Sequence, residues 1–171
     1  MRARLTRSNG DMSDAKGQAL IELAITLPLL LLLLMSIFDY SRAINAQSII
    51  TNMSREGANL IARANSNLTG DEQTNFQNVL DLIGKTAQPL DMVNQGMMYI
   101  YKVERLNSVN RVTSLGWNRS VASPKPPLAA GLGGTTLNEG QSVYGVEVYY
   151  QYRSIFLRNN FSPTLKSISI F

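Results

Sequence analysis

The sequence predicts an α+β protein with a long N-terminal transmembrane and amphipathic helix, a short second helix, and a three- to four-stranded antiparallel sheet. Three observations carry this prediction. No charged residue occurs from Leu23 to Phe38. Beyond that run, apolar residues recur every three or four positions to about residue 64, and from about residue 97 they recur every second position. A helical period followed by a strand period favours helices and strands in separate layers.

The uncharged run is the first element. Extended back to Gln18, it predicts a transmembrane helix over residues 18–38. These 21 residues would span about 32 Å, which is close to the thickness of a bilayer core. Four basic residues precede the run, namely Arg2, Arg4, Arg7 and Lys16, against the acidic Asp11 and Asp14. Because basic residues concentrate on the cytoplasmic side, we expect a cytoplasmic N-terminus and the bulk of the chain outside.

The helical period continues through residues 39–66, which predicts an amphipathic extension of the same helix. One face is apolar, with Ala46, Ile50, Met53, Gly57, Leu60 and Ala64. Arg42, Arg55, Glu56 and Arg63 fall off that stripe. A single helix from about Gln18 to Ala64, covered on one side in its outer half, is therefore expected.

The remaining residues, 67–171, are expected to form an extracytoplasmic head. Thr69 to Glu72 resembles a capping box that opens a helix with an apolar face from Phe76 to Ile83. Strands are predicted from about residue 97, over 111–117, over 144–152 and over 165–171, with a loop at residues 107–110 and a Pro- and Gly-rich loop at 123–134. Tyr144, Val146, Val148, Tyr150 and Tyr152 should share one sheet face.

The composition excludes several chemistries. The chain has no cysteine and no histidine, so thiol nucleophiles, Ser-His-Asp triads and thiolate or imidazole metal sites are absent. The spacing of the carboxylates in the head does not indicate an acid–base pair; these residues are Asp91, Glu104, Glu139 and Glu147. No catalytic residue, metal site or cofactor is predicted. The net charge of +4 falls to +2 without residues 1–17, which hold four of the basic and two of the acidic side chains, and this argues against nucleic acid as a partner.

A specific pattern lies at the start of the apolar run. Glu22 is the fifth residue after Gly17, a costly position for a carboxylate unless its charge has a partner. Residues 17–28 read GQALIELAITLP, residues 37–42 read IFDYSR, and residues 52–58 read NMSREGA. The chain here resembles type IV pilin precursors and, more closely, the TadE-like pseudopilins of the tight-adherence (Tad/Flp) pilus system, over Lys16 to about Ala64.

The resemblance implies a pilin-like fold and a function. It implies that residues 1–17 are a cytoplasmic leader, cut by a prepilin peptidase between Gly17 and Gln18, and that the protein is a minor pseudopilin in the assembly of an adhesive pilus. The implied location is the bacterial inner membrane, with a periplasmic C-terminal domain. The implied partners are other Tad pilins and pseudopilins, the assembly platform and the lipid bilayer. Glu22 would set subunit register, and the family-matched helix positions are Pro28, Arg42, Arg55, Glu56 and Gly57.

Two other interpretations of the N-terminus stay open. A secretory signal peptide would need cleavage near Ser41 to Ala43, where Arg42 carries a charge and Glu22 is left unexplained. An uncut anchor needs neither Gly17 nor Glu22. The alternative function is therefore a single-pass, unprocessed binding domain, for example for surface polysaccharide, and a membrane-bound hydrolase ranks third.

Overall fold

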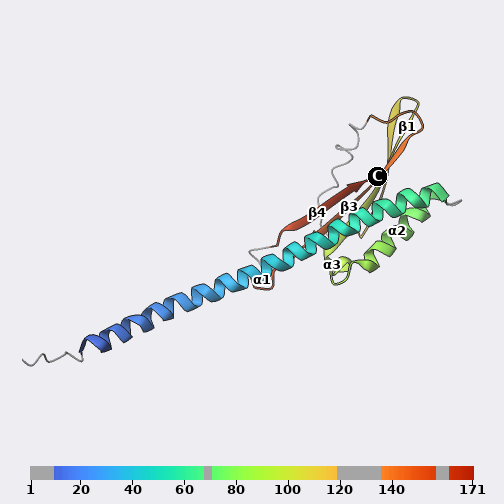
Figure 1. Ribbon diagram of the computed structural model, residues 1–171. Helices are drawn as coiled ribbons and strands as arrows, with labels where there is room; N and C mark the ends of the chain where they lie inside the picture. The colour runs from blue at the N-terminus through green and yellow to red at the C-terminus, as the bar shows by residue number, and fades with distance from the viewer. Residues whose placement is uncertain (1–9, 68–70, 119–135, 157–161) are drawn as a thin grey trace, which may run out of the picture. The chain divides into compact units, whose positions relative to one another are not determined.

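The computed structural model describes residues 10–67, 71–118, 136–156 and 162–171. It confirms the α+β class: a long helix, two shorter helices and four antiparallel strands follow one another along the chain (Figure 1). The chain divides into two compact units, residues 1–41 and residues 42–171. The predicted loop at residues 123–134 and most of the leader lie outside the described residues.

The first helix, α1, runs from Gly10 to Asn67. It begins before the predicted Gln18 and ends three residues after Ala64. Among the described residues, it is the one helix long and apolar enough to cross a membrane. Its large apolar side chains from Leu20 to Phe38 are all exposed, which suits a lipid environment because only an apolar solvent favours such a surface.

The sheet has the strand order β2-β1-β3-β4, with every neighbouring pair antiparallel. The four strands are β1 (Gly96–Leu106), β2 (Val109–Trp117), β3 (Ser142–Gln151) and β4 (Thr164–Ile170). The turn between β1 and β2 is shorter than the predicted loop at residues 107–110. Asn107 and Ser108 both have positive φ, 52° and 64°, and Leu106 already pairs with Val109. Two consecutive residues in the left-handed conformation match the twist of a hairpin, so β2 begins at Val109, two residues before the predicted start.

The second half of α1 and the helix α2 (Glu72–Thr86) cover one face of the sheet (Figure 1). The predicted face of β3 is confirmed, because Tyr144, Val146, Val148 and Tyr150, and also Tyr152 after the strand, are buried in this core. From α1 the core receives Ala43, Ala46, Ile50, Met53, Ala58 and Ile61. The tyrosine-bearing face of β3 therefore packs against the helices.

The start of α2 differs from the predicted capping box. Asp71 is the N-cap residue, and its side chain makes no capping hydrogen bond; Thr69 lies outside the described residues. The helix is held instead by its packing, since Phe76, Val79, Leu80 and Ile83 are buried, and by Lys102 of β1, whose Nζ lies 2.8 Å from Glu72 Oε1. Tertiary contacts decide where this helix begins.

A third helix, α3 (Met92–Gln95), escaped sequence analysis because four residues carry no periodicity. The Asp91 side chain caps it by accepting the Asn94 backbone N–H at 3.2 Å. On the other side, the Asn118 amide donates to the backbone oxygens of Met92, Val93 and Gly96. The helix thus depends on a residue that follows β2.

Candidate functional site

Gly17 and Gln18, the residues of the predicted cleavage site, lie near the start of α1 and are exposed. A Cβ added at Gly17 would meet nothing within 4 Å. The Gln18 side-chain amide donates to Glu22 Oε1 at 3.3 Å, and both residues are exposed. This is the i, i+4 contact that one helix makes with itself. Both groups remain accessible to a peptidase or to a neighbouring subunit.

The hydroxyl groups in the apolar stretch donate hydrogen bonds to backbone carbonyls of the same helix. Thr26 Oγ1 donates to the Glu22 carbonyl at 2.7 Å, and Ser36 Oγ donates to the Leu32 carbonyl at 2.8 Å. Each hydroxyl group thus donates to a carbonyl of its own helix, which matters because the lipid interior offers no hydrogen-bond acceptors. Pro28 sits inside the helix and is exposed; it lacks an N–H donor, so one turn of the ladder loses a hydrogen bond there. The segment fits a membrane anchor.

The Arg-Glu-Gly-Ala turn of α1 separates into two faces. Arg55 and Glu56 are exposed, whereas Gly57 and Ala58 are buried. Ser54, also buried, makes hydroxyl–hydroxyl hydrogen bonds with Ser167 at 2.9 Å and Ser169 at 3.0 Å on β4. The inward residues of the turn hold α1 on the sheet, and the outward pair is free to contact something else. Arg42 is exposed at the start of the second unit, whereas Glu22 and Pro28 belong to the first.

Gly57 occupies a position where any side chain meets the core. A Cβ at Gly57 would lie 2.5 Å from Ile83 Cδ1 of α2 and 3.2 Å from Val146 Cγ1 of β3. The absence of a side chain thus permits α1, α2 and β3 to meet. The sequence pattern placed Gly57 on the apolar stripe but held no sign of this three-way contact.

We expect Gly57→Leu to lower the free energy of unfolding by up to about 2 kcal/mol, because overpacking costs about 1–3 kcal/mol and the gain in helix propensity offsets about 1 kcal/mol of it. Denaturant unfolding followed by the fluorescence of Trp117, the one tryptophan in the chain, measures the change. Asn59→Leu, at an exposed position of the same helix, should stay within about 0.5 kcal/mol. Equal effects of the two substitutions would contradict the packing role.

A buried carboxylate lies on the opposite face of the sheet. Glu147 of β3 is 0% exposed. Its Oε2 accepts a hydrogen bond from the Tyr101 hydroxyl at 2.6 Å, and its Oε1 accepts one from the Tyr149 hydroxyl at 2.7 Å. Lys166 Nζ of β4 lies 2.5 Å from Oε1. Sequence analysis missed this cluster, because a charge between Val146 and Val148 in an alternating strand ordinarily lies on the solvent-facing side of the sheet.

The cluster ties three strands together around one charge. Tyr101 comes from β1, Glu147 and Tyr149 from β3, and Lys166 from β4. A second apolar group surrounds it and includes Met97, Tyr99, Val103 and Leu137. Burial raises the pKa of the Tyr101 and Tyr149 hydroxyls, and the hydrogen bonds to Glu147 raise them further. Both tyrosines stay neutral donors, which the carboxylate needs.

These two tyrosines predict loss of stability at high pH. Their pKa values are raised in the folded state, so between about pH 10 and pH 11 the unfolded chain loses protons that the folded chain keeps. Their stabilising contribution is complete below about pH 10. Above it, we expect the free energy of unfolding to fall by about 1.4 kcal/mol per pH unit for each tyrosine. Urea unfolding at pH 9 and pH 11 measures this; Tyr149→Phe should make the fall shallower, and an unchanged fall would contradict the assignment.

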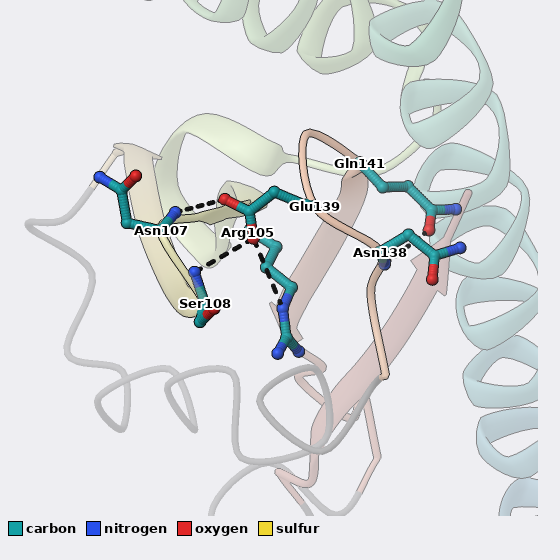
Figure 2. A network of polar contacts seen from close by, with 6 residues as sticks. All are labelled: Arg105, Asn107, Ser108, Asn138, Glu139 and Gln141. Carbon is teal, nitrogen blue, oxygen red and sulfur yellow. Dashed lines mark hydrogen bonds and ion pairs between the residues drawn. The ribbon is translucent and has the colours of Figure 1, made fainter.

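A polar network closes the tip of the β1–β2 hairpin (Figure 2). The Glu139 carboxylate accepts the backbone N–H groups of Asn107 and Ser108, the latter at 3.1 Å, and lies 4.0 Å from Arg105 Nε. Beside it, the Gln141 side chain accepts the Asn138 N–H at 3.1 Å. The network anchors residues 138–141 to the turn. The Glu139 carboxylate therefore stabilises the hairpin.

The described residues contain no group of three or more carboxylates that would hold a metal ion. Small cavities in the described part of the second unit include one of about 300 Å³ between α2 and β2 and one of about 220 Å³ beside Arg42. Asp91, Glu104, Glu139 and Glu147 each contact different partners. The geometry described here thus offers anchoring and packing surfaces, with acidic groups kept apart.

The fold and the first helix define a class: an α+β head that follows an apolar helix fit to anchor it in a membrane. Residues 17–59 match the family model described as TadE-like protein. This segment of the chain is TadE-like, which confirms the resemblance of its motifs and points to a protein associated with the Tad pilus. No curated protein and no solved structure gives a significant match to the chain.

Proposed function

We propose that the protein is a minor pseudopilin, cut by a prepilin peptidase between Gly17 and Gln18, that takes part in assembly or initiation of a Tad (Flp) type IV pilus for surface adhesion. One observation carries the proposal: the family match begins at residue 17, the residue just before the proposed cleavage. The open surroundings of Gly17 and the carboxylate of Glu22 five positions later support it.

The proposed location is the bacterial inner membrane, with the N-terminus in the cytoplasm and the C-terminal domain in the periplasm. The basic residues before the apolar run support this orientation. Its partners would be the prepilin peptidase, other Tad pilins and pseudopilins, and the membrane platform that assembles them. The role is structural rather than catalytic, and the exposed Arg55 and Glu56 are the outward groups of α1 that a neighbouring subunit would meet.

We expect Gly17→Val to block removal of the leader, because the peptidase must approach the backbone closely where only glycine has no side chain. Intact-mass analysis of the protein from its native membrane measures this. The wild-type protein should begin at Gln18 and the variant at Met1. Gly10→Val, at the other glycine that the leader places in α1, should still be cut.

Two results would reject the proposal. A wild-type protein that begins at Ile44 would indicate a secretory signal peptide, and one that begins at Met1 would indicate an uncut anchor that tethers a binding domain. A copy number in sheared pili equal to that of the principal pilin would reject the minor role, even if the leader is removed.

A further inference from the structure

A small cavity in the second unit is lined by two basic side chains. It measures about 220 Å³ and lies between α1, the segment before α3 and the end of β3. Arg42 and Arg153 line it, together with the amide side chains of Asn45 and Gln95 and the ring of Tyr150. Among the described residues that line it, none is aspartate or glutamate.

The two guanidinium groups are available for an anion. Both arginines are exposed, and within the described part of residues 42–171 no ion pair joins either of them to a carboxylate. Asp91, which follows the lining residue Leu90, is occupied: Asn94 donates to it through its side chain at 2.7 Å and its backbone at 3.2 Å. These hydrogen bonds lower the pKa of Asp91, and the charge of Arg153 adds to the effect.

The cavity is suited to a small multivalent oxyanion. Guanidinium groups match the geometry of phosphate oxygens and donate two hydrogen bonds at once. Amide and phenol groups provide further donors, and Ala46 and Leu90 provide an apolar wall. A volume of about 220 Å³ is below the range of about 300–1,000 Å³ that whole drug-sized ligands need, so it accommodates a headgroup-sized anion.

The position of Arg42 in the sequence indicates where such an anion would come from. Arg42 follows Phe38, the last residue of the uncharged run, by four residues of continuous helix. That distance is about 6 Å along the helix, similar to the thickness of one lipid headgroup layer, about 5–7 Å. A guanidinium group close to the membrane surface can donate hydrogen bonds to the phosphate of a lipid headgroup.

We propose that the cavity between Arg42 and Arg153 binds a phosphate group, carried either by an anionic lipid headgroup or by free inorganic phosphate. This inference goes beyond the pilus role and does not depend on it. The cavity holds the phosphate through two arginines that are far apart in the sequence, so binding would also brace α1 against the segment that follows β3.

Calorimetric titration of the full chain in a neutral maltoside detergent tests this proposal. The probes are inorganic phosphate, dihexanoylphosphatidylglycerol and acetate, each with a detergent blank. We expect saturable binding of at least one phosphate probe, weakened about tenfold or more by Arg42→Gln and by Arg153→Gln, because each removes charged hydrogen bonds. Arg63→Gln, an exposed arginine of the same helix outside the cavity, should bind within about twofold of wild type.

The two phosphate probes distinguish the sources. Tighter binding of the phosphatidylglycerol supports a lipid headgroup, and tighter binding of inorganic phosphate supports the free ion. Absence of saturable binding of both probes to the wild-type protein would overturn the proposal. Wild-type affinity in both arginine variants, or acetate binding as tight as phosphate, would overturn it as well.

Discussion

Replacement of Glu22 by leucine is expected to leave membrane insertion and cleavage after Gly17 intact, and to remove the protein from complexes with its partner pilins. Cleavage gives Gln18 a new α-amino group with a pKa of about 7.7–8.0, largely cationic near neutral pH. An amine and a carboxylate about 4 Å apart attract by about 4 kcal/mol at an effective dielectric of 20, before desolvation is subtracted. The carboxylate of Glu22 can pair with the amine of a neighbouring subunit and fix their axial offset.

We expect the amount of co-purified partner pilins to fall at least about tenfold. A net attraction of about 1.4 kcal/mol after the desolvation cost is sufficient, because that free energy corresponds to a tenfold change in affinity. Immunoprecipitation from native membranes and counts of surface pili measure it. Glu22→Gln, which keeps the shape and removes the charge, should reproduce the defect. Thr26→Val, which removes a polar group one turn away but keeps the carboxylate, should assemble as wild type.

Normal assembly by Glu22→Leu would contradict the register mechanism even if the family assignment is right. The contact between the Gln18 side chain and Glu22 at 3.3 Å would then represent the whole role of this carboxylate. It would be a group at the start of the membrane segment that is satisfied within its own helix.

Glu147→Ala is expected to lower the free energy of unfolding of the head by about 3–5 kcal/mol, from a typical total of about 5–15 kcal/mol. The substitution removes the acceptor for two tyrosine hydroxyls, on side chains only 3% and 4% exposed. Each unsatisfied hydroxyl costs about 1–3 kcal/mol. Lys166 adds less, because its side chain is 39% exposed and can turn to solvent. Denaturant unfolding followed by Trp117 fluorescence measures the loss.

Glu104→Ala is the matched control on the neighbouring strand. Its carboxylate lies 3.5 Å from Lys102 Nζ and its side chain is 30% exposed, so its removal should cost no more than about 1 kcal/mol. Glu147→Gln keeps an acceptor and should fall between the two alanine variants. A cost below about 1 kcal/mol for Glu147→Ala would mean that the tyrosine hydroxyls find other acceptors when the sheet repacks.

The sequence by itself determined the elements whose signal is local and periodic. The uncharged run from Leu23 to Phe38 defined the membrane-length helix because length and composition alone decide that property. The alternation from Tyr144 to Tyr152 defined a strand and its buried face, since successive side chains of a strand point to opposite sides. The spacing of Gly17 and Glu22 predicted a pilin-type start, and the motifs at residues 17–28, 37–42 and 52–58 predicted the TadE-like segment, because a linear motif is read by position in the chain.

Only the tertiary structure decided which residues meet across long stretches of chain. Glu147 lies 46 residues from Tyr101, so no window of sequence reveals that the two share a buried hydrogen bond. Gly57 reads as one more small residue on a stripe until Ile83 and Val146 pack against it. Arg42 and Arg153 line the same cavity only because the end of β3 lies beside α1. Periodicity fixes which side of an element faces the core, whereas the identity of the facing residues depends on how the elements pack together.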